Sequence, residues 1–507
     1  SNPYVRLDVM TGQNGKFTKR NSVLGMAQET GAVAGINGDY FNTSLEGAPL
    51  GPQISAGELM STPSELTGMY AFALTKNRVP MIDLFTFQGS VTAADGTAYP
   101  LAGINKAAYM TEPDKRYSHV DALYIYTSAW AQVERPKNSS TTPTEVLVQN
   151  DTVVRISEKA SLAMLPPEDG YILRAHGKAA DFVLQHLKPG DRVSASYLLQ
   201  SAVTGKPFDP AEFETMIGGH TILVNEGKPV ANFSRSVDSL GGYRSRTGLG
   251  YSKDGRYVYL ITVSGYGDSQ GMSLREFQEA MTMAGVWKGL NLDGGGSTTM
   301  VTRPLGETSA TLTHPTDYGT QQRLVVNGLG VYTTAPKGEP KGIAISGETM
   351  LLIGERATYQ IKGYDQYYNP IEISAGNTKW SISEPIGTIK DGVFTATKAG
   401  KTTITAQTGT AKQSIKVEVA GRDQIRQMSI DTGELALEAG ATYTLPVSVE
   451  LKDGRKRKVP ANSIKWEIIG FDGKMDGDTL TIRSVRDNRT GYVIARYDGF
   501  SAMAVLK

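Results

Sequence analysis

The feature that most constrains the fold is a repeat in the last third of the chain. Segments 351–383 and 435–469 share a pattern of alternating apolar residues, and a Lys-Trp pair lies near the end of each, with Trp380 and Trp466 86 residues apart. Short alternating runs separated by turn residues about every 8–12 positions are typical of β-sandwiches. The repeat therefore predicts two consecutive all-β domains, and we expect both tryptophans in their cores.

A change of composition separates this repeat from the rest of the chain. Residues 333–341, TTAPKGEPK, combine Pro, Gly and charges that can bury little surface, so they are predicted to form a linker. We expect a first domain at 1–334, a sandwich at 338–420 and a second sandwich at 421–507. The two sandwiches resemble bacterial Ig-like domains, which follow catalytic domains on cell-surface proteins.

The composition excludes several classes of site and partner. Lys plus Arg number 52 and Asp plus Glu 51, so the net charge of +1 gives no field to hold a polyanion, which argues against nucleic-acid binding. Cysteine is absent, which excludes disulfides, thiolate metal sites and a cysteine nucleophile. The sequence has no HExxH motif and no apolar run of about 18 residues, so neither a histidine metal site nor a membrane span is expected. We interpret the first two residues, Ser-Asn, as the scar of a tag.

The first 332 residues mix β-rich runs with a few amphipathic helices. Ser273-Leu-Arg-Glu276 has the form of a capping box, in which Glu276 would reach back to the amide of Ser273. The buried face of that helix would be formed by Phe277, Ala280, Met281 and Ala284. A second helix is predicted within 177–191, and β-strands within 122–130, 144–150, 192–199, 220–227, 256–265 and 323–332. This order indicates an α+β first domain with mixed β-sheets and a few helices.

Four stretches place polar residues and glycine beside apolar strands, where pockets tend to form. Each alone is also an ordinary turn. They are GINGDYF at 35–41, MIGGHTILV at 216–224, RSRTGLGYS at 244–252, and LNLDGGGSTTM at 290–300 with RLVVNGLGVY at 323–332.

Together and in this order, the four stretches resemble the phosphodiester glycosidase family. The resemblance covers most of residues 1–332, and its most specific part is the block from Ser264 to Val301, SGYGDSQGMSLREFQEAMTMAGVWKGLNLDGGGSTTMV. It implies a catalytic first domain that cleaves between an anomeric sugar carbon and a phosphate oxygen, as in N-acetylglucosamine-1-phosphodiesters.

Such a reaction passes through an oxocarbenium-like transition state. A phosphate monoester is a weak base and leaves easily, so a general acid matters less than it does for an alkoxide leaving group. The site must supply cationic and amide donors for the phosphate and a carboxylate near the anomeric carbon.

The candidate residues fall into two groups. Asp293 is the preferred carboxylate, as nucleophile or water-activating base, with Asp39 or His220 as the second titrating group. Arg246 is the preferred phosphate ligand because its fork matches phosphate oxygens, and the glycine turn would add backbone and hydroxyl donors as an anion nest. The other substrate-binding candidates are Asn37, Gly294, Gly295, Gly296, Ser297, Thr298, Asn327 and Arg323. No metal ligand and no cofactor is assigned.

Each main candidate has a structural alternative. Asp293 could only cap the turn that follows its strand, Arg246 could pair with a structural carboxylate, and His220 could be a hydrogen-bonded strand residue. Arg323 could also be structural, and Glu276 is interpreted as a helix cap only.

The leading hypothesis is a secreted or cell-surface bacterial glycosidase that hydrolyses sugar-1-phosphodiesters, with wall or capsular glycopolymers as substrates. Its partner would be a carbohydrate or sugar phosphate, not nucleic acid. One alternative is a glycosidase of ordinary glycans, for which Asp39 or His220 should become indispensable. Another is a non-catalytic glycan- or wall-binding protein. The five basic residues within 452–458 indicate either a solvated hairpin or a contact with an anionic wall polymer.

Overall fold

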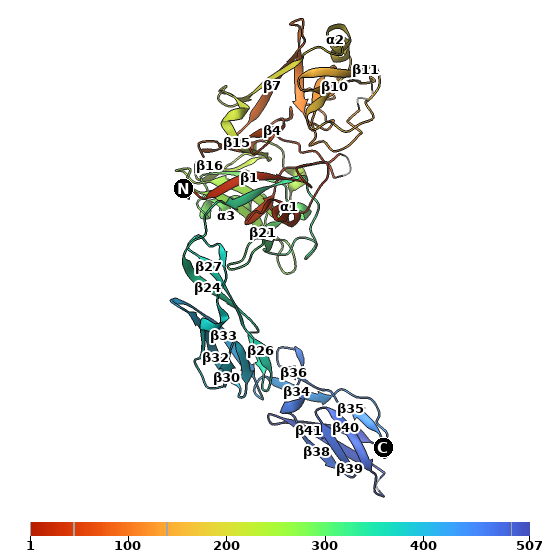
Figure 1. The fold of residues 1–507 in the computed structure, drawn as a ribbon, viewed down its shortest axis with the longest axis vertical. Helices are drawn as coiled ribbons and strands as arrows, with labels where there is room; N and C mark the ends of the chain where they lie inside the picture. The colour runs from red at the N-terminus through yellow and green to blue at the C-terminus, as the bar shows by residue number, and fades with distance from the viewer. Residues whose placement is uncertain (1, 44–45, 138–139, 488) are drawn as a thin grey trace. The chain divides into compact units, whose positions relative to one another are not determined.

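The computed structural model describes residues 2–43, 46–137, 140–487 and 489–507 (Figure 1). Contacts divide the chain into two compact units. The first comprises Ser1–Pro304 with Ser309–Ala335, and the second Leu305–Thr308 with Pro336–Lys507.

Within the described residues, the first unit contains three five-stranded sheets and one eight-stranded sheet. In strand order the first two sheets are β1 (Val5–Thr11), β23 (Asn327–Thr333), β2 (Ala34–Asn37), β21 (Met300–Thr302), β22 (Thr311–Leu312); and β17 (Lys228–Pro229), β16 (Ile222–Asn225), β20 (Lys288–Asn291), β18 (Arg246–Tyr251), β19 (Val258–Val263). The third is β4 (Glu58–Ser61), β3 (Gln53–Ser55), β15 (Phe213–Gly218), β5 (Ala71–Thr75), β6 (Pro80–Asp83). The eight-stranded sheet is β11 (Thr152–Ser157), β10 (Thr144–Gln149), β12 (Gly170–Ala175), β9 (Leu123–Tyr126), β8 (Ala98–Ile104), β7 (Phe85–Thr92), β13 (Ser194–Ser201), β14 (Pro207–Phe208).

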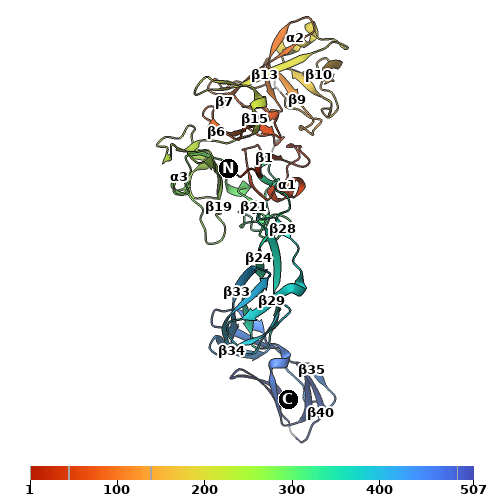
Figure 2. The same cartoon turned by 60° about the vertical axis from the view of Figure 1, so that its left-hand side comes forward.

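Helices are few in this unit. Within the described ranges they are α1 (Val23–Thr30), α2 (Lys178–His186) and α3 (Leu274–Met283). The eight-stranded sheet with α2 lies at one end of the unit, and the strands around β1 lie with α1 and α3 at the other (Figures 1 and 2). Because β8 and β9 pair in parallel while their neighbours pair antiparallel, the sheet is mixed. The predicted α+β class is confirmed.

The local predictions hold with two corrections, both in α3. Ser273 caps the helix by accepting the amide of Glu276 at 3.2 Å, but the Glu276 carboxylate accepts the Tyr243 hydroxyl at 2.7 Å instead of reaching back. The buried face includes Gln278, whose Nε2 donates to two backbone carbonyls, whereas Ala284 is exposed. A strand overlaps each of the six predicted strand ranges, and β13 and β23 run one or two residues past theirs.

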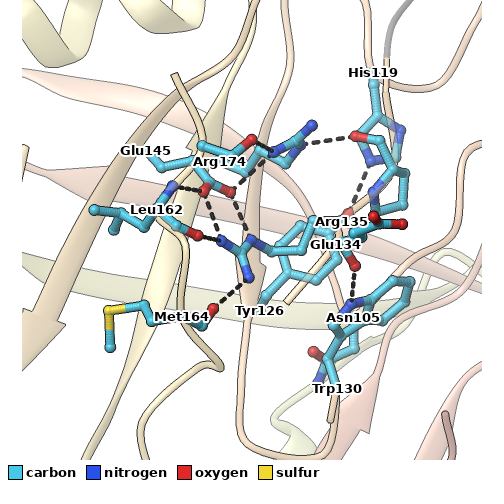
Figure 3. Close-up of polar contacts among 12 residues, drawn as sticks. Asn105, His119, Tyr126, Trp130, Glu134, Arg135, Glu145, Leu162, Met164 and Arg174 are labelled. Atoms are coloured by element: carbon cyan, nitrogen blue, oxygen red, sulfur yellow. Dashed lines mark hydrogen bonds and ion pairs between the residues drawn. The ribbon is translucent and has the colours of Figure 1, made fainter. Parts of the chain in front are cut away.

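A buried charge network holds the loops beside β10 (Figure 3). The Glu145 carboxylate accepts Arg135 Nε and Nη2, each at 2.6 Å, and Arg174 Nη1 at 3.0 Å, and all three side chains are almost fully buried. Arg135 also donates to the carbonyls of Leu162 and Met164. Because burying charge is costly unless each group is paired, this network fastens the chain at Arg135, Leu162 and Met164 to the sheet.

The second unit is built of strands. Its sheets, in strand order, are β24 (Pro340–Ser346), β27 (Gln360–Asp365), β28 (Pro370–Ile371); β25 (Met350–Leu352), β33 (Ala411–Ala420), β32 (Gly400–Thr408), β29 (Thr378–Ile382); β26 (Arg356–Thr358), β31 (Val393–Ala396), β30 (Gly387–Lys390); β34 (Ile425–Ile430), β36 (Val447–Leu451), β37 (Lys456–Lys458); β35 (Thr442–Thr444), β40 (Thr479–Ser484), β39 (Asp472–Asp476); and β38 (Lys465–Ile469), β41 (Gly491–Tyr497), β42 (Phe500–Leu506). The predicted all-β class is confirmed.

Two details of this unit bear on the predictions. Trp380 and Trp466 pack against the apolar cores, as expected, and are partly buried. In the basic hairpin, Arg457 pairs with Glu355 at 2.7 Å and Arg455 with Asp453 at 2.5 Å. These partners neutralise part of the hairpin and favour the solvated-loop interpretation. No helix in the described part of the chain is both long and apolar enough to cross a membrane.

Candidate active site

Two of the predicted stretches meet through hydrogen bonds that link different sheets. Asn37 Nδ2 donates to the Asp293 carbonyl at 2.7 Å, and the Asp293 amide donates to the Gly38 carbonyl at 3.0 Å. The Tyr40 hydroxyl donates to the Leu292 carbonyl at 2.9 Å. The ends of β2 and β20 are therefore held side by side.

The third stretch joins the same cluster through the start of β18. The Leu292 amide donates to the Thr247 carbonyl at 2.9 Å, and Thr247 Oγ1 donates to Asn37 Oδ1 at 2.8 Å. The Gly295 amide donates to the Ser245 carbonyl at 2.8 Å. Residues separated by more than two hundred positions in the sequence thus form one hydrogen-bonded cluster.

The remaining stretches complete the cluster. The His220 amide donates to the Asn291 carbonyl at 2.9 Å. The Asp39 amide donates to Asn327 Oδ1 at 2.9 Å, and Asn327 Nδ2 donates to Gln53 Oε1 at 2.8 Å. All four stretches predicted from the sequence are therefore in contact.

The structure explains why each of the three positions in the turn is a glycine. A Cβ on Gly294 would lie 2.9 Å from the Ser245 carbonyl oxygen. Gly295 has φ +59°, in the left-handed region, with nothing within 4 Å of its Cβ position. A Cβ on Gly296 would lie 2.4 Å from the Tyr318 hydroxyl and 2.5 Å from Arg323 Nη2. Close packing explains two of the glycines, and backbone conformation explains the third.

The predicted anion nest is not free to receive an anion in this geometry. The amide of Gly295 donates to Ser245, that of Ser297 to Gly294 at 3.2 Å, and that of Thr298 to Gly295 at 3.0 Å. These bonds form the short 3₁₀ turn η3 (Gly295–Ser297). The Thr298 hydroxyl accepts from Thr247 at 3.1 Å. Three backbone amides of the turn, those of Gly295, Ser297 and Thr298, are therefore already occupied by carbonyl oxygens.

Asp293 lies half-buried at the centre of the cluster. Burial raises the pKa of its carboxyl to about 6, while the Ser297 hydroxyl, the Arg323 guanidinium and the Gly294 amide act to lower it. Arg323 Nη1 donates to Ser297 Oγ at 3.3 Å, so the arginine and the carboxyl share one hydroxyl between them. At neutral pH this carboxyl is mostly ionised, as a nucleophile or base requires.

Asp39 is 1% exposed and holds a loop. Its carboxylate accepts the amides of Tyr40 and Gly51, each at 2.7 Å. Burial raises the pKa of Asp39, and the negative charge of Asp293 adds to this, while Lys106 opposes it. Burial lowers the pKa of Lys106 in turn. Asp39 is placed to position the loop and Tyr40, and it presents almost no surface to a substrate.

His220 stacks obliquely on Tyr40, with ring centroids 5.4 Å apart. Burial, and secondarily the charge of Arg235, lower the pKa of His220 to about 4, so the ring is neutral at pH 7. Its Nδ1 is buried and has no hydrogen-bond partner among the described residues. A neutral imidazole cannot act as a general acid at neutral pH.

Arg246 is placed differently from its prediction. It is 2% exposed, and its guanidinium donates to the carbonyls of Met272, Leu240 and Gly242 at 2.9, 2.9 and 2.6 Å. It thus ties the backbone of residues 240–242 to that of Met272 instead of pairing with a carboxylate. Arg323, which the sequence ranked last, is the cation beside Asp293.

Three residues of the cluster were not predicted. Tyr40 stood inside a quoted stretch, but its bond to Leu292 had no signal in the sequence. Lys106 donates to the carbonyls of Pro49 and Leu50 at 3.1 and 2.9 Å. The Tyr318 hydroxyl accepts Arg323 Nη2 at 2.6 Å. Within the described ranges, no three histidine or acidic side chains are grouped so that they could bind a metal ion.

Two cavities in the described part of the first unit lie apart from the predicted site residues. One of about 450 Å³ and one of about 480 Å³ border β1, and neither is lined by a predicted site residue. The first is lined by Leu74, Val258 and Leu260 with Arg6, Arg78 and Arg256.

Comparison with known proteins agrees with the α+β class of this unit. The model of the phosphodiester glycosidase family matches residues 142–332, which contain β18, β20 and the glycine turn. The family resemblance predicted from the sequence is thereby confirmed for this range. No curated protein matches the sequence.

Two solved structures with TM-scores above 0.5 share the fold at low identity. A hypothetical protein from Synechocystis is 20% identical with a TM-score of 0.52, over 66% of this chain and 57% of that one. A protein from Burkholderia pseudomallei K96243, described as a candidate exported protein, is 19% identical with a TM-score of 0.53, over 65% and 71%. The catalytic domain of zebrafish N-acetylglucosamine-1-phosphodiester alpha-N-acetylglucosaminidase is 16% identical over 65% and 73%, with a TM-score of 0.34. The chain thus spans little more than half of the Synechocystis protein, and at these identities the likeness concerns the fold alone.

Proposed function

We propose that the first unit hydrolyses the bond between an anomeric sugar carbon and phosphate in sugar-1-phosphodiesters. The observation that carries this proposal is the pairing of Asp293 with Arg323 across the Ser297 hydroxyl, inside the range that matches the phosphodiester glycosidase family. A carboxylate for the anomeric carbon and a cation for the phosphate are the two groups that the reaction requires.

We assign a role to each site residue from its position in the cluster. Asp293 would attack the anomeric carbon or activate the water that does. Arg323 replaces Arg246 as the phosphate ligand, because the Arg246 guanidinium is occupied by three carbonyls. Asn37 and Asn327 hold the backbone around Asp293 and Asp39, so their role would be to position these residues.

Neither Asp39 nor His220 is suited to protonate a leaving oxygen at neutral pH, because Asp39 is 1% exposed and His220 carries no extra proton, and this favours a phosphate leaving group over an alkoxide. His220 is neutral at pH 7, since its pKa is lowered to about 4. The buried Asp39 carboxyl group accepts hydrogen bonds from two backbone amides. Cleavage of an ordinary glycoside needs a general acid at the leaving oxygen, whereas a phosphate leaves without one. The alternative of an ordinary glycosidase is therefore the weaker one.

The test compares two substrates that differ in the leaving group. The protein is incubated with methyl N-acetylglucosamine-α-1-phosphate diester and with benzyl α-N-acetylglucosaminide, and free N-acetylglucosamine is measured. We expect release from the diester only. Asp293→Asn should lower the rate by about 10³-fold or more, while Asp254→Asn, an exposed aspartate in the turn before β19, should leave it unchanged. Cleavage of the benzyl glycoside alone would support the ordinary glycosidase, and binding without any cleavage would support a glycan-binding protein.

The biological setting is part of the proposal. We propose an exported bacterial enzyme with a domain at 1–334 and two Ig-like sandwiches at 338–420 and 421–507, acting on wall or capsular glycopolymers with glycosyl-phosphate bonds. Incubation with purified wall polymer should release free sugar and new phosphomonoesters. No release from any such polymer, with turnover of the synthetic diester intact, would remove the wall substrate and keep the chemistry.

A further inference from the structure

The cavity of about 450 Å³ beside β1 combines apolar and cationic lining residues. It lies wholly within the first unit and is bordered by β1, β5, β15, β19 and β23 together with the turns that precede β6 and β19. Its volume falls within the range of about 300–1,000 Å³ that is common for small-molecule sites. The size of the cavity therefore suits a small ligand of mixed polarity.

The apolar lining residues belong to the outer side of a core. Four of them pack against the core cluster that contains Leu7, and yet each is only partly buried. These four residues, which we call the floor, are Leu74, Val258, Leu260 and Val331. Contiguous apolar surface that a protein leaves accessible is characteristic of a binding site. The floor therefore favours a ligand that has an apolar part.

The charged lining residues are predominantly basic. Four exposed cations oppose a single carboxylate, that of Glu214. The cations, which we call the rim, are Arg6, Lys76, Arg78 and Arg256. None of the ion pairs among the described residues includes Arg6, Lys76 or Arg78. Because the whole chain has a net charge of only +1, this positive charge is a local feature, and it favours a ligand with an anionic part.

Arg78 lies at a backbone position that does not favour arginine. It has φ +65°, in the left-handed region, in the turn between β5 and β6. The Arg78 amide donates to the Thr75 carbonyl at 2.8 Å, and its guanidinium donates to the Asn2 carbonyl at 3.0 Å in an exposed contact. Asparagine or glycine would suit this conformation better. The turn thus carries a cation beside the cavity where an asparagine would strain the backbone less.

Charge and polarity together select one kind of occupant. A second copy of this chain in a two-fold contact would bring two cationic rims together, because such an interface presents the same surface from both sides. A neutral apolar ligand would leave the rim unmatched, and a small hydrophilic anion would leave the floor in water. An acyl chain that ends in a carboxylate matches both, since its methylenes are buried on the floor and its carboxylate accepts charge-assisted hydrogen bonds from guanidinium groups.

We propose that this cavity is a binding site for a fatty-acid anion, with the acyl chain on the floor and the carboxylate at the rim beside Arg78. The site is separate from the candidate active site, and this inference does not rest on the proposed function.

The experiment measures the binding of sodium decanoate to the full chain at neutral pH by isothermal titration calorimetry. Two compounds serve as partial ligands: decyltrimethylammonium has the same chain with the opposite charge, and acetate has the head group alone. We expect saturable binding of decanoate and about tenfold weaker binding of octanoate, which lacks two methylenes. Neither partial ligand should bind saturably at the same concentrations.

Arg78→Asn tests the rim without disturbing the fold, because asparagine tolerates a positive φ. The loss of a charged hydrogen-bond donor should weaken decanoate binding by about tenfold, at an unchanged or higher Tm. Lys159→Asn is the matched control. It also removes a cation at a positive φ, of 49°, in the turn after β11 and outside the cavity, so it should change neither the affinity nor Tm.

Several results would overturn the proposal. Decanoate that fails to bind, or that binds Arg78→Asn as tightly as the wild type, would reject the site. Equal affinity for decyltrimethylammonium would mean an apolar cavity without selection for charge, and equal affinity for acetate would mean a surface contact for small anions. If decanoate does not bind and sedimentation shows a dimer that Arg78→Asn dissociates, the cavity belongs to a second copy. Hydrolysis enters none of these measurements, so failure of this inference and failure of the proposed function are distinguishable.

Discussion

Alanine substitution of each glycine in the turn that follows Asp293 tests the structural account of the candidate site most directly. The three positions are consecutive and the chemical change is the same, yet the structure predicts three different outcomes. In Gly294→Ala the new methyl group meets the Ser245 carbonyl oxygen at 2.9 Å, which is backbone and cannot rotate away. That carbonyl also accepts the Gly295 amide.

Moving the Ser245 carbonyl loses most of a hydrogen bond worth about 1 kcal/mol and adds about 1–3 kcal/mol of packing strain. We therefore expect Gly294→Ala to lower the free energy of unfolding by about 2–4 kcal/mol. Gly295→Ala meets no atom within 4 Å but forces a residue with a Cβ into φ +59°, which costs about 1–2 kcal/mol. At about 2–4 °C per kcal/mol, both losses are measurable by thermal unfolding.

Gly296→Ala should, in contrast, lower the activity more than the stability. The atoms that its methyl group meets are the ends of two side chains, the Tyr318 hydroxyl and the Arg323 guanidinium, which can swing away at little cost in stability. Displacing Arg323 removes a charged hydrogen bond to substrate, worth about 1.5–3 kcal/mol, so kcat/KM should fall by about 10–100-fold.

The assays are thermal unfolding and hydrolysis of the methyl diester on the same preparations. Gly296→Ala should be the most stable of the three variants, Gly295→Ala intermediate and Gly294→Ala the least stable. The activity per folded molecule should be lowest in Gly296→Ala. If the glycines instead formed a phosphate nest, Gly295→Ala would lose the most activity, because it alone needs the left-handed backbone. That result, or a fully active Gly296→Ala, would refute the packing explanation.

Three further predictions follow from the buried groups. Asp293→Asn should raise Tm at pH 7, because burial raises the pKa of Asp293 from 3.8 to about 6 and ionisation between about pH 4 and 6 therefore weakens the wild-type fold; the difference should disappear at pH 4, and an equal gain at both pH values would contradict it. Glu145→Gln should cost about 3–5 kcal/mol in denaturant unfolding, since it leaves two buried guanidinium groups uncompensated, while Glu168→Gln, whose side chain is 79% exposed in its pair with Lys16, should change stability by less than about 0.5 kcal/mol. Arg246→Met should lower Tm and activity together, whereas Arg323→Met should lower activity at unchanged Tm; the opposite result would return the phosphate to Arg246.

The sequence was sufficient for the parts of the fold that depend on local pattern. The helix α3 followed from the Ser273 cap and a 3.6-residue apolar period, and the strand runs followed from alternation. The helix α1 was not predicted, because its eight residues include Gly25 and are too few to show a period. Ser22 at its N-cap and Gly31 at φ 77° after its end were the signals present.

The candidate site was predicted as a set of segments more successfully than as a set of roles. Each segment could be found because glycine and a polar residue follow an apolar strand. The roles depend on acceptors that have no signature in sequence. Arg246 is held by the backbone carbonyls of loops around Leu240 and Met272, and any residue can supply a carbonyl. The sequence therefore favoured Arg246, which lies in the glycine-containing stretch 244–252, over Arg323 as the phosphate ligand.

The same reasoning applies to the buried pair of Asp39 and Lys106. Lys106 Nζ lies within 3.4 Å of the carbonyl oxygens of residues 49–51, and Asp39 accepts the amide of Gly51, so the two charges hold one loop from opposite sides. Asp39 also accepts the amide of Tyr40, whose hydroxyl fixes the strand end before Asp293. A charge on Asp39 thus influences Asp293 through the backbone as well as through space. We therefore expect Asp39 to matter for activity as a positioning residue, because the carboxylate with access to a substrate is that of Asp293.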